Sequence, residues 1–184
     1  MKVRSTIVAV MATTALTTAA FAGLAQPAGA ADTTTTFTLT GGALSISAPS
    51  SKALGSAATG SASITAQLGT TTVTDARGAL LGSWTGSVAS TDFTTGLATA
   101  NETIAKTDAD YWSGAATAST GLGTFTPGQL LVANKVTLAS SRTAFSAASV
   151  IGNNSVSWNP TVGINVPAAA VAGTYSGTIT HSVA

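Results

Sequence analysis

Apolar and polar residues alternate with a period of two over much of this chain. The clearest runs lie at residues 36–40, 44–47, 63–68, 161–166 and 175–183. Successive side chains of a strand point to opposite faces, so this period is typical of strands with one buried and one exposed face. Thr or Ser fills most of the polar positions, and Thr favours strands because it is β-branched. The pattern predicts an all-β domain of antiparallel strands.

Short clusters of turn-forming residues separate these runs. They lie at residues 41–42, 49–50, 75–78, 126–128, 152–154 and 166–167. Turns about ten residues apart are typical of a β-sandwich or barrel. Residues 97–128 carry much of the charge and several glycines, and we expect one or two short strands with long loops there.

The first thirty residues have the composition of a secretory signal peptide. Lys2 and Arg4 precede an uncharged run over residues 5–24, and Ala28-Gly29-Ala30 matches a small-x-small cleavage site. A membrane anchor is the competing interpretation, but many Thr residues dilute the run and the cleavage pattern follows it directly. We therefore expect residues 1–30 to be removed and residues 31–184 to form a single exported domain without a membrane anchor. Such a domain would be extracellular or associated with the cell wall.

The composition excludes several kinds of site. The 184 residues contain no Cys and one His, and 7% of them are charged. Disulfides and thiolate metal sites are therefore absent, and zinc binding or His-based catalysis has little support. The net charge of +1 comes without a basic cluster, which disfavours nucleic acid as a partner. We expect no cofactor and no bound metal.

No arrangement of residues in the sequence indicates catalysis. The G-x-S-x-G pattern of hydrolases does not occur. Asp75 and Asp92 are predicted turn formers whose carboxylates accept backbone N–H groups, and Asp108 and Asp110 are expected in a solvated loop. A secreted hydrolase would need a carboxylate pair around Asp108 and Asp110. We expect a protein that is not an enzyme.

The candidate binding residues are aromatic, because Trp and Tyr commonly form platforms for sugars or partner proteins. Tyr111 and Trp112 are the better candidates for surface contact, whereas Trp158 could lie on either side of the sheet. Trp84 alternates with small or apolar residues and is expected to face the core. His181 shares a face with two apolar residues of the last strand, which favours a partly buried or rim position.

Several segments occur together in a recognisable order. They are residues 73–78, Ser83-Trp84-Thr85 with Asp92-Phe93 downstream, Val166-Pro167, and residues 172–180. This order resembles the WxL-type surface domain of Gram-positive bacteria. The resemblance implies export, an Ig-like β-sandwich and non-covalent association with peptidoglycan through two Trp-x-Leu motifs. By position the first motif falls on residues 84–86 and lacks its Leu, and the second falls on residues 181–183 with His181 in place of its Trp.

These observations lead to two hypotheses of function. The first is a non-catalytic, secreted cell-surface domain that binds peptidoglycan or another cell-surface protein. The alternative is a structural subunit of a surface fibre or coat, which self-associates by pairing of strand edges. Low charge supports the alternative because few charged side chains protect the edges of the sheets.

Overall fold

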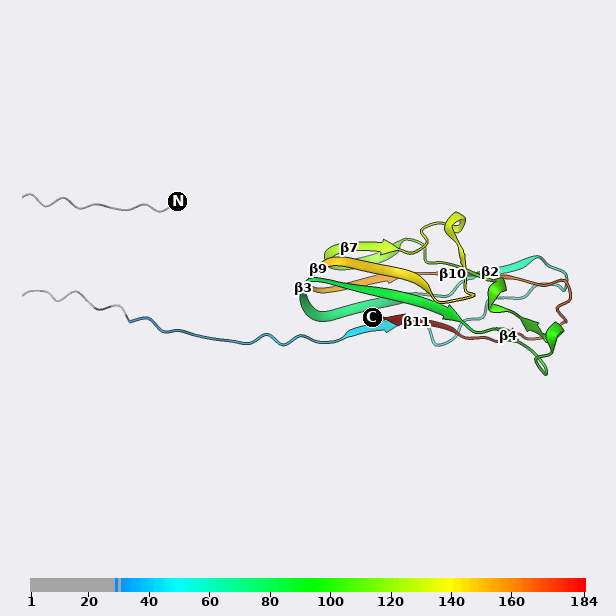
Figure 1. The fold of residues 1–184 in the computed structure, drawn as a ribbon, viewed down its shortest axis with the longest axis horizontal. Coiled ribbons are helices and arrows are strands. Elements are labelled where there is room, and N and C mark those ends of the chain that lie inside the picture. Colours follow the sequence, from blue (N-terminus) through cyan, green and yellow to red (C-terminus); the bar gives the residue numbers. More distant parts are fainter. Residues whose placement is uncertain (1–28, 30) are drawn as a thin grey trace, which may run out of the picture. The chain divides into compact units, whose positions relative to one another are not determined.

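The computed structural model describes Gly29 and residues 31–184. The predicted signal peptide, apart from Gly29, lies outside the described residues. A boundary at Phe37 and Thr38 separates the N-terminal segment from a compact unit of residues 38–184, which is all-β as the sequence predicts (Figure 1). No helix in the part of the chain that the structure describes is long and apolar enough to span a bilayer.

Two antiparallel sheets and a small ribbon make up this unit. The first sheet has the order β1-β3-β9-β7, and β11 also pairs with β3. The second has the order β2-β10-β6-β8, and β4 pairs with β5. The bounds are β1 Leu44–Ser47, β2 Ser63–Gln67, β3 Thr71–Ser90, β4 Phe93–Thr94, β5 Thr103–Ile104, β6 Ala109–Trp112, β7 Ala116–Pro127, β8 Val136–Thr137, β9 Arg142–Trp158, β10 Thr161–Asn165 and β11 Ile179–Val183. Three short 3₁₀ turns connect them, at Ala100–Glu102, Lys106–Asp108 and Val132–Asn134.

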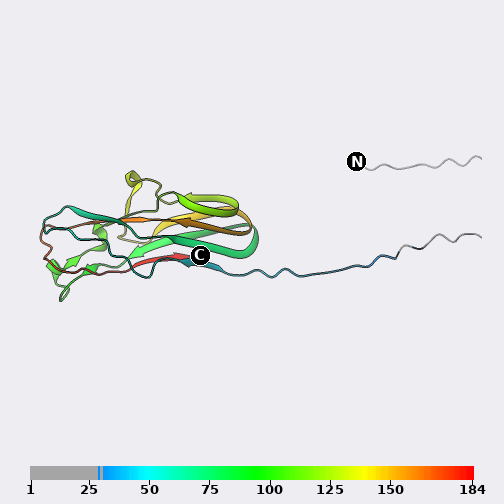
Figure 2. The same ribbon diagram turned by 180° about the vertical axis from the view of Figure 1, so that it is seen from behind.

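The three long strands β3, β9 and β7 turn back on themselves at one end of the domain (Figures 1 and 2). Phe145 and Trp158 both lie on β9, yet their rings stack with centroids 5.0 Å apart. A straight strand would separate these two residues by about 43 Å. The first sheet is therefore bent over, and its two halves face each other as the layers of a sandwich.

Residues with positive φ produce the bend. Gly78 and Leu81 have φ values of 66° and 58° on β3, Ser149 and Gly152 have 54° and 69° on β9, and Gly121 has 83° on β7. The pairing register shifts at the same places. A left-handed residue that disrupts the ladder and bends the strand is the geometry of a β-bulge.

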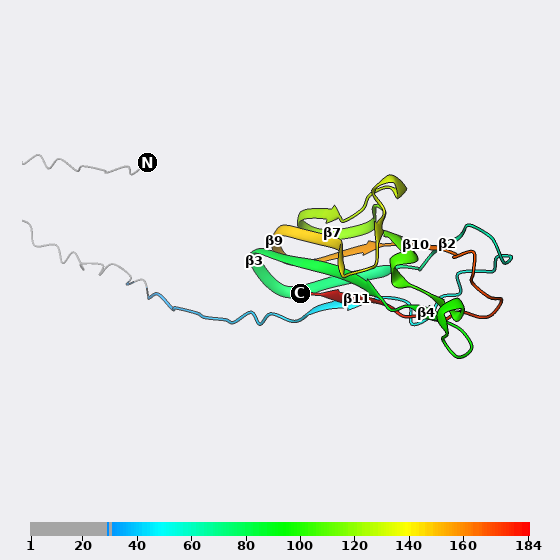
Figure 3. The same cartoon turned by 45° about the vertical axis from the view of Figure 1, so that its right-hand side comes forward.

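The second sheet extends one layer of the sandwich. β10 follows β9 after a break at Pro160, and β2 precedes β3, so each continues its long neighbour (Figure 3). β10 pairs with β2 on one side and with β6 on the other. The core between the layers contains the largest fully buried side chains, Trp158, Tyr111, Phe145 and Leu138.

A polar cluster joins the layers near the bend. The indole Nε1 of Trp84 donates to Oδ1 of Asn154 at 3.0 Å, and Nδ2 of Asn154 donates to Asp75 at 3.3 Å. Arg77 forms an ion pair with Asp75 at 2.9 Å. The hydrogen bonds from Arg77 hold the pKa of the Asp75 carboxyl at about 2.

Three local predictions differ from the structure. The segments 75–78 and 152–154 are bends inside β3 and β9 and not turns between strands, because bulges use the same Gly and Asn residues as turns. Residues 97–128 contain the twelve-residue strand β7, so the expectation of only short strands with long loops is wrong there. The strand predicted over residues 36–40 does not form, and Phe37 and Leu39 are 86% and 88% exposed.

Candidate functional site

A shallow groove of about 460 Å³ lies on the outer face of the second sheet, around Trp112. Trp112 is the last residue of β6 and pairs with Thr161 of β10. Tyr111, one residue earlier, is fully buried, whereas Trp112 is partly exposed. The alternation of a strand explains this difference, because neighbouring residues point to opposite faces.

Gly163 of β10 lies next to the Trp112 ring on this face and is itself buried. A Cβ atom at Gly163 would meet the ring at 3.7 Å, which is an ordinary van der Waals distance. The indole ring therefore packs against β10, beside the pairing partner of Trp112, Thr161.

Neutral hydrogen-bonding groups surround the indole. The amide Nδ2 of Asn159 donates to Oε1 of Gln67 at 3.1 Å, and the backbone N–H of Gly69 donates to Oδ1 of Asn159 at 3.0 Å. Thr117 and Thr161 add hydroxyl groups at the rim of the groove. Its other wall is apolar and exposed, and it consists of Leu130, Leu131 and Val132. No charged residue lines the groove.

Beside the groove, the same face carries an ion pair between a buried carboxylate and an exposed lysine. Asp110 lies two residues before Trp112 and is 7% exposed. Nζ of Lys135 donates to its Oδ2 at 2.6 Å, and Nδ2 of Asn165 donates to the same oxygen at 3.1 Å. The expectation that Asp110 lies in a solvated loop is therefore wrong, because it is a strand residue with two partners.

Three of the predicted aromatic residues are not on the surface. Trp84, Tyr111 and Trp158 are 2%, 0% and 0% exposed, so surface contact by these side chains is excluded. Trp84 faces the core as its alternation predicts. The prediction of a surface role for Tyr111 is wrong, because β6 turns this residue inward and Trp112 outward.

His181 occupies the partly buried position that the sequence predicts for it, and a chain of hydrogen bonds ties it to the core. The indole N–H of Trp158 donates to Oη of Tyr111 at 3.4 Å, and Oη lies 3.1 Å from Nε2 of His181. Burial lowers the pKa of His181 from 6.5 to about 4 and raises the pKa of Tyr111 above its usual range. Both side chains are therefore neutral at pH 7.

The remaining carboxylates serve local structure. Asp75 accepts the backbone N–H of Arg77 at 3.0 Å, as predicted, and Asp92 accepts the backbone N–H of Lys106 at 2.8 Å. Glu102 accepts the backbone N–H of Thr99 at 3.0 Å and its hydroxyl at 2.7 Å. Among the described residues, no three His, Asp or Glu side chains are placed to hold a metal ion together.

Sequence reasoning found Trp112 but missed its neighbours in the groove. Gln67 lies on β2, whereas Thr161 begins β10 and Asn159 lies two residues before it, and strand pairing brings the two segments together with Trp112. Alternation around Tyr111 and Trp112 was the one usable signal, since it requires that only one of these two residues faces outward.

Comparison of the chain with family models, with curated proteins and with solved structures gives no match.

Proposed function

We propose that this protein is a non-catalytic, exported cell-surface domain that associates non-covalently with peptidoglycan through the Trp112 groove. One observation carries the proposal, which is the partly exposed indole of Trp112 among the amides of Gln67 and Asn159. Sugar rings present an apolar face and a rim of hydroxyl groups. An aromatic ring suits the face, while amide side chains both donate to and accept from hydroxyls.

The sequence adds support from two directions. The first thirty residues have the composition of an export signal, and the motif order resembles the WxL-type surface domain. Trp84 and His181, the positions that correspond to the family's motifs, are buried or partly buried here. Binding by this chain is therefore proposed through Trp112 and not through an exposed Trp-x-Leu motif.

Co-sedimentation with purified peptidoglycan tests the proposal. We expect retention at low and at high salt, because no charged side chain lines the groove and screening has little to weaken. Trp112→Ala should reduce affinity at least tenfold, as is typical of a central Trp in a binding surface. Leu80→Ala is the matched control, since Leu80 is 79% exposed on the bend and outside the groove.

Two results would overturn this assignment. Equal retention of the Trp112→Ala variant would exclude the groove as the binding surface. Retention on whole cell walls, but not on walls stripped of protein, would identify a cell-surface protein as the partner in place of peptidoglycan.

Strand β7 favours a second candidate function, self-assembly into a fibre or coat. It lies at the edge of its sheet, most of its twelve residues are exposed, and none of them is charged. Such an edge is a template for pairing with another chain. Thr124→Lys on β7 should abolish any concentration-dependent oligomer seen in sedimentation, whereas Thr74→Lys on the inner strand β3 should not. A monomer at millimolar concentration would rule out this function.

A further inference from the structure

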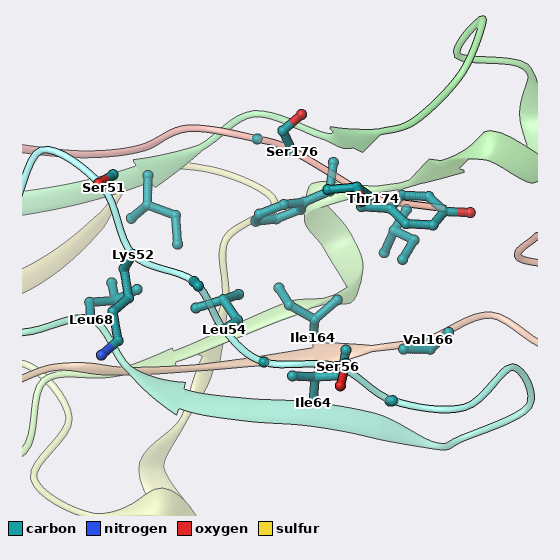
Figure 4. A pocket seen from close by; sticks show the side chains of 18 of the residues that line it. Ser51, Lys52, Leu54, Ser56, Ile64, Leu68, Ile164, Val166, Thr174 and Ser176 are labelled. Atoms are coloured by element: carbon teal, nitrogen blue, oxygen red, sulfur yellow. The ribbon is translucent and has the colours of Figure 1, made fainter. Parts of the chain in front are cut away.

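A cavity of about 660 Å³ lies on the other side of the second sheet, within the sandwich. Its floor is formed by β2 and β10, and two irregular segments cover it, residues 48–59 and residues 170–178 (Figure 4). Leu54, Ile64 and Ile164 supply apolar side chains to its wall, as Figure 4 shows. A volume of 300–1,000 Å³ is typical of pockets for small organic ligands.

The lining of the cavity contains one buried polar group without a partner among the described residues. Thr71 lines it with a side chain that is fully buried, and no group in the structure bonds to its Oγ1. A buried hydroxyl without a hydrogen bond costs free energy, so such groups are rare unless a ligand or water completes them. Thr71 pairs with Trp158 across β3 and β9, and His181 lies edge-on to the same indole at 6.4 Å. Thr71 and His181 both line the cavity.

His181 contributes its imidazole ring to the lining of the cavity. Its Nε2 lies 3.1 Å from Oη of Tyr111, and Oη accepts the indole N–H of Trp158 at 3.4 Å. Burial lowers the pKa of His181 to about 4, so the ring is neutral at pH 7. The imidazole therefore adds no charge to the lining and can report on binding in the cavity.

Charge is nearly absent from the lining. Among the described residues that line the cavity, none is acidic and Lys52 is the only charged one. Lys52 is exposed on the covering segment 48–59, at the side of the cavity in Figure 4. The rest of the lining carries no cation, so a carboxylate bound there would be buried without a counter-ion.

We infer that this cavity binds an uncharged, single-chain aliphatic molecule whose terminal hydroxyl or carbonyl oxygen accepts a hydrogen bond from the hydroxyl of Thr71. The aliphatic chain lies along Ile64, Ile164 and Leu54. This activity is independent of the proposed peptidoglycan binding, because the Trp112 groove lies on the opposite face of the sheet.

Titration with 1-octanol, followed by NMR, tests the inference. The protein has one histidine, so ¹⁵N-histidine labelling gives the signals of a single imidazole. We expect 1-octanol to shift the imidazole ¹⁵N resonances and the methyl signals of Ile64 and Ile164, all with one saturating curve. 1-Chlorooctane has a similar shape but is a poor acceptor, and it should bind roughly threefold to tenfold more weakly for the loss of a neutral hydrogen bond.

Two variants locate the binding. Leu54→Trp fills the cavity from an irregular segment and should abolish the shifts, while Leu80→Trp on the exposed bend should leave them unchanged. Thr71→Val keeps the shape of the side chain and should weaken octanol roughly threefold to tenfold, with chlorooctane unaffected. Because this change removes an unpartnered hydroxyl, the variant is expected to fold.

Three outcomes would overturn the inference. Absence of saturable shifts at millimolar 1-octanol would exclude the ligand class. Equal affinities for octanol and chlorooctane would exclude the hydrogen bond to Thr71. Tighter binding of octanoate than of octanol would mean that an anionic head group at Lys52 determines recognition instead.

Discussion

The two faces of the β2-β10-β6-β8 sheet differ in how their polar groups are satisfied. On the outer face, Gln67 and Asn159 bond to each other, and Asp110 is paired with Lys135. In the cavity against its inner face, Oγ1 of Thr71, the first residue of the neighbouring strand β3, has no partner among the described residues. These side chains on the outer face therefore have hydrogen-bond partners without a ligand. Gln67 and Asn159 can exchange the bond between them for bonds to a hydroxylated polymer. The inner face retains unused hydrogen-bonding capacity in an apolar setting, where each additional bond counts for more.

Two adjacent residues of β6 show how this difference arises. Tyr111 points inward and belongs to the core, whereas Trp112 points outward and forms the groove. The two are chemically similar, so the pleat of the strand decides their roles and not the residue type. The comparison predicts that changes on the inner face alter stability, while changes on the outer face alter binding alone.

The largest effect should come from the inner aromatic residues. Trp158→Ala removes a fully buried side chain that stacks on Phe145 and flanks His181, and we expect the free energy of unfolding to fall by about 3–5 kcal/mol. Trp112→Ala is the matched change on the outer face and should cost less than about 1 kcal/mol. Urea denaturation of both variants measures the difference. Equal losses would contradict the division between the two faces.

The next effect is a pH dependence that arises on the inner face. The pKa of His181 is about 4 in the folded protein and 6.5 when unfolded, so the unfolded state binds more protons between these values. The free energy of unfolding is therefore at its highest above pH 6.5. It decreases as the pH falls towards 4, by at most roughly 3 kcal/mol. Asp75 adds a further loss only between its usual 3.8 and about 2.

Unfolding free energies at pH 7, 5.5 and 4.5 measure this dependence. His181→Gln keeps an acceptor for the hydroxyl of Tyr111 but does not titrate, so its stability should be flat over the same range. If His181→Gln keeps the slope of the unmodified protein, another group causes the pH dependence.

A smaller effect, with the opposite sign, is expected at Thr71. Replacing its unpartnered hydroxyl with a methyl group of similar shape should raise stability by about 1 kcal/mol in Thr71→Val. Thr74→Val is the control, since Thr74 lies on the same strand with an exposed side chain, and it should change stability by less than about 0.5 kcal/mol. A loss of stability in Thr71→Val would show that a partner satisfies the hydroxyl.

The sequence predicts the strands better than their shape. Alternation is a local signal, and it correctly identifies β1, β2, β10 and β11. The bends of β3 and β9 use the residues of turns, and only the pairing of Asp75 with Asn154 and of Ala79 with Gly152 shows that both strands continue through them. Pairing joins residues far apart in the chain, and no local pattern records it.

The Trp112 groove and the cavity also differ in how far the sequence predicts them. The inward Tyr111 and outward Trp112 follow from alternation once β6 is recognised as a strand. The cavity does not follow from any pattern. Residues 48–59 that cover it have no periodicity, and residues 175–178 alternate like the strand after them but form an irregular segment. Their packing over Ile64 and Ile164 depends on the position of the two layers relative to each other.

Replacing Gln67 should change stability the least of these variants, yet it should clearly weaken the binding of peptidoglycan. Its side chain is exposed, and its one hydrogen bond, accepted from Asn159, can be replaced by water, so Gln67→Ala should alter the free energy of unfolding by less than about 0.5 kcal/mol. The freed Asn159 amide would still bond to Gly69 N–H, which keeps the groove in shape. Peptidoglycan affinity should nevertheless fall roughly threefold to tenfold, because a polymer hydroxyl loses an amide partner. Paired denaturation and co-sedimentation curves measure both quantities on one preparation. A loss of stability without a loss of binding would reverse the roles assigned to the two faces, since Gln67 would then act as a structural residue and Trp112 would bind without it.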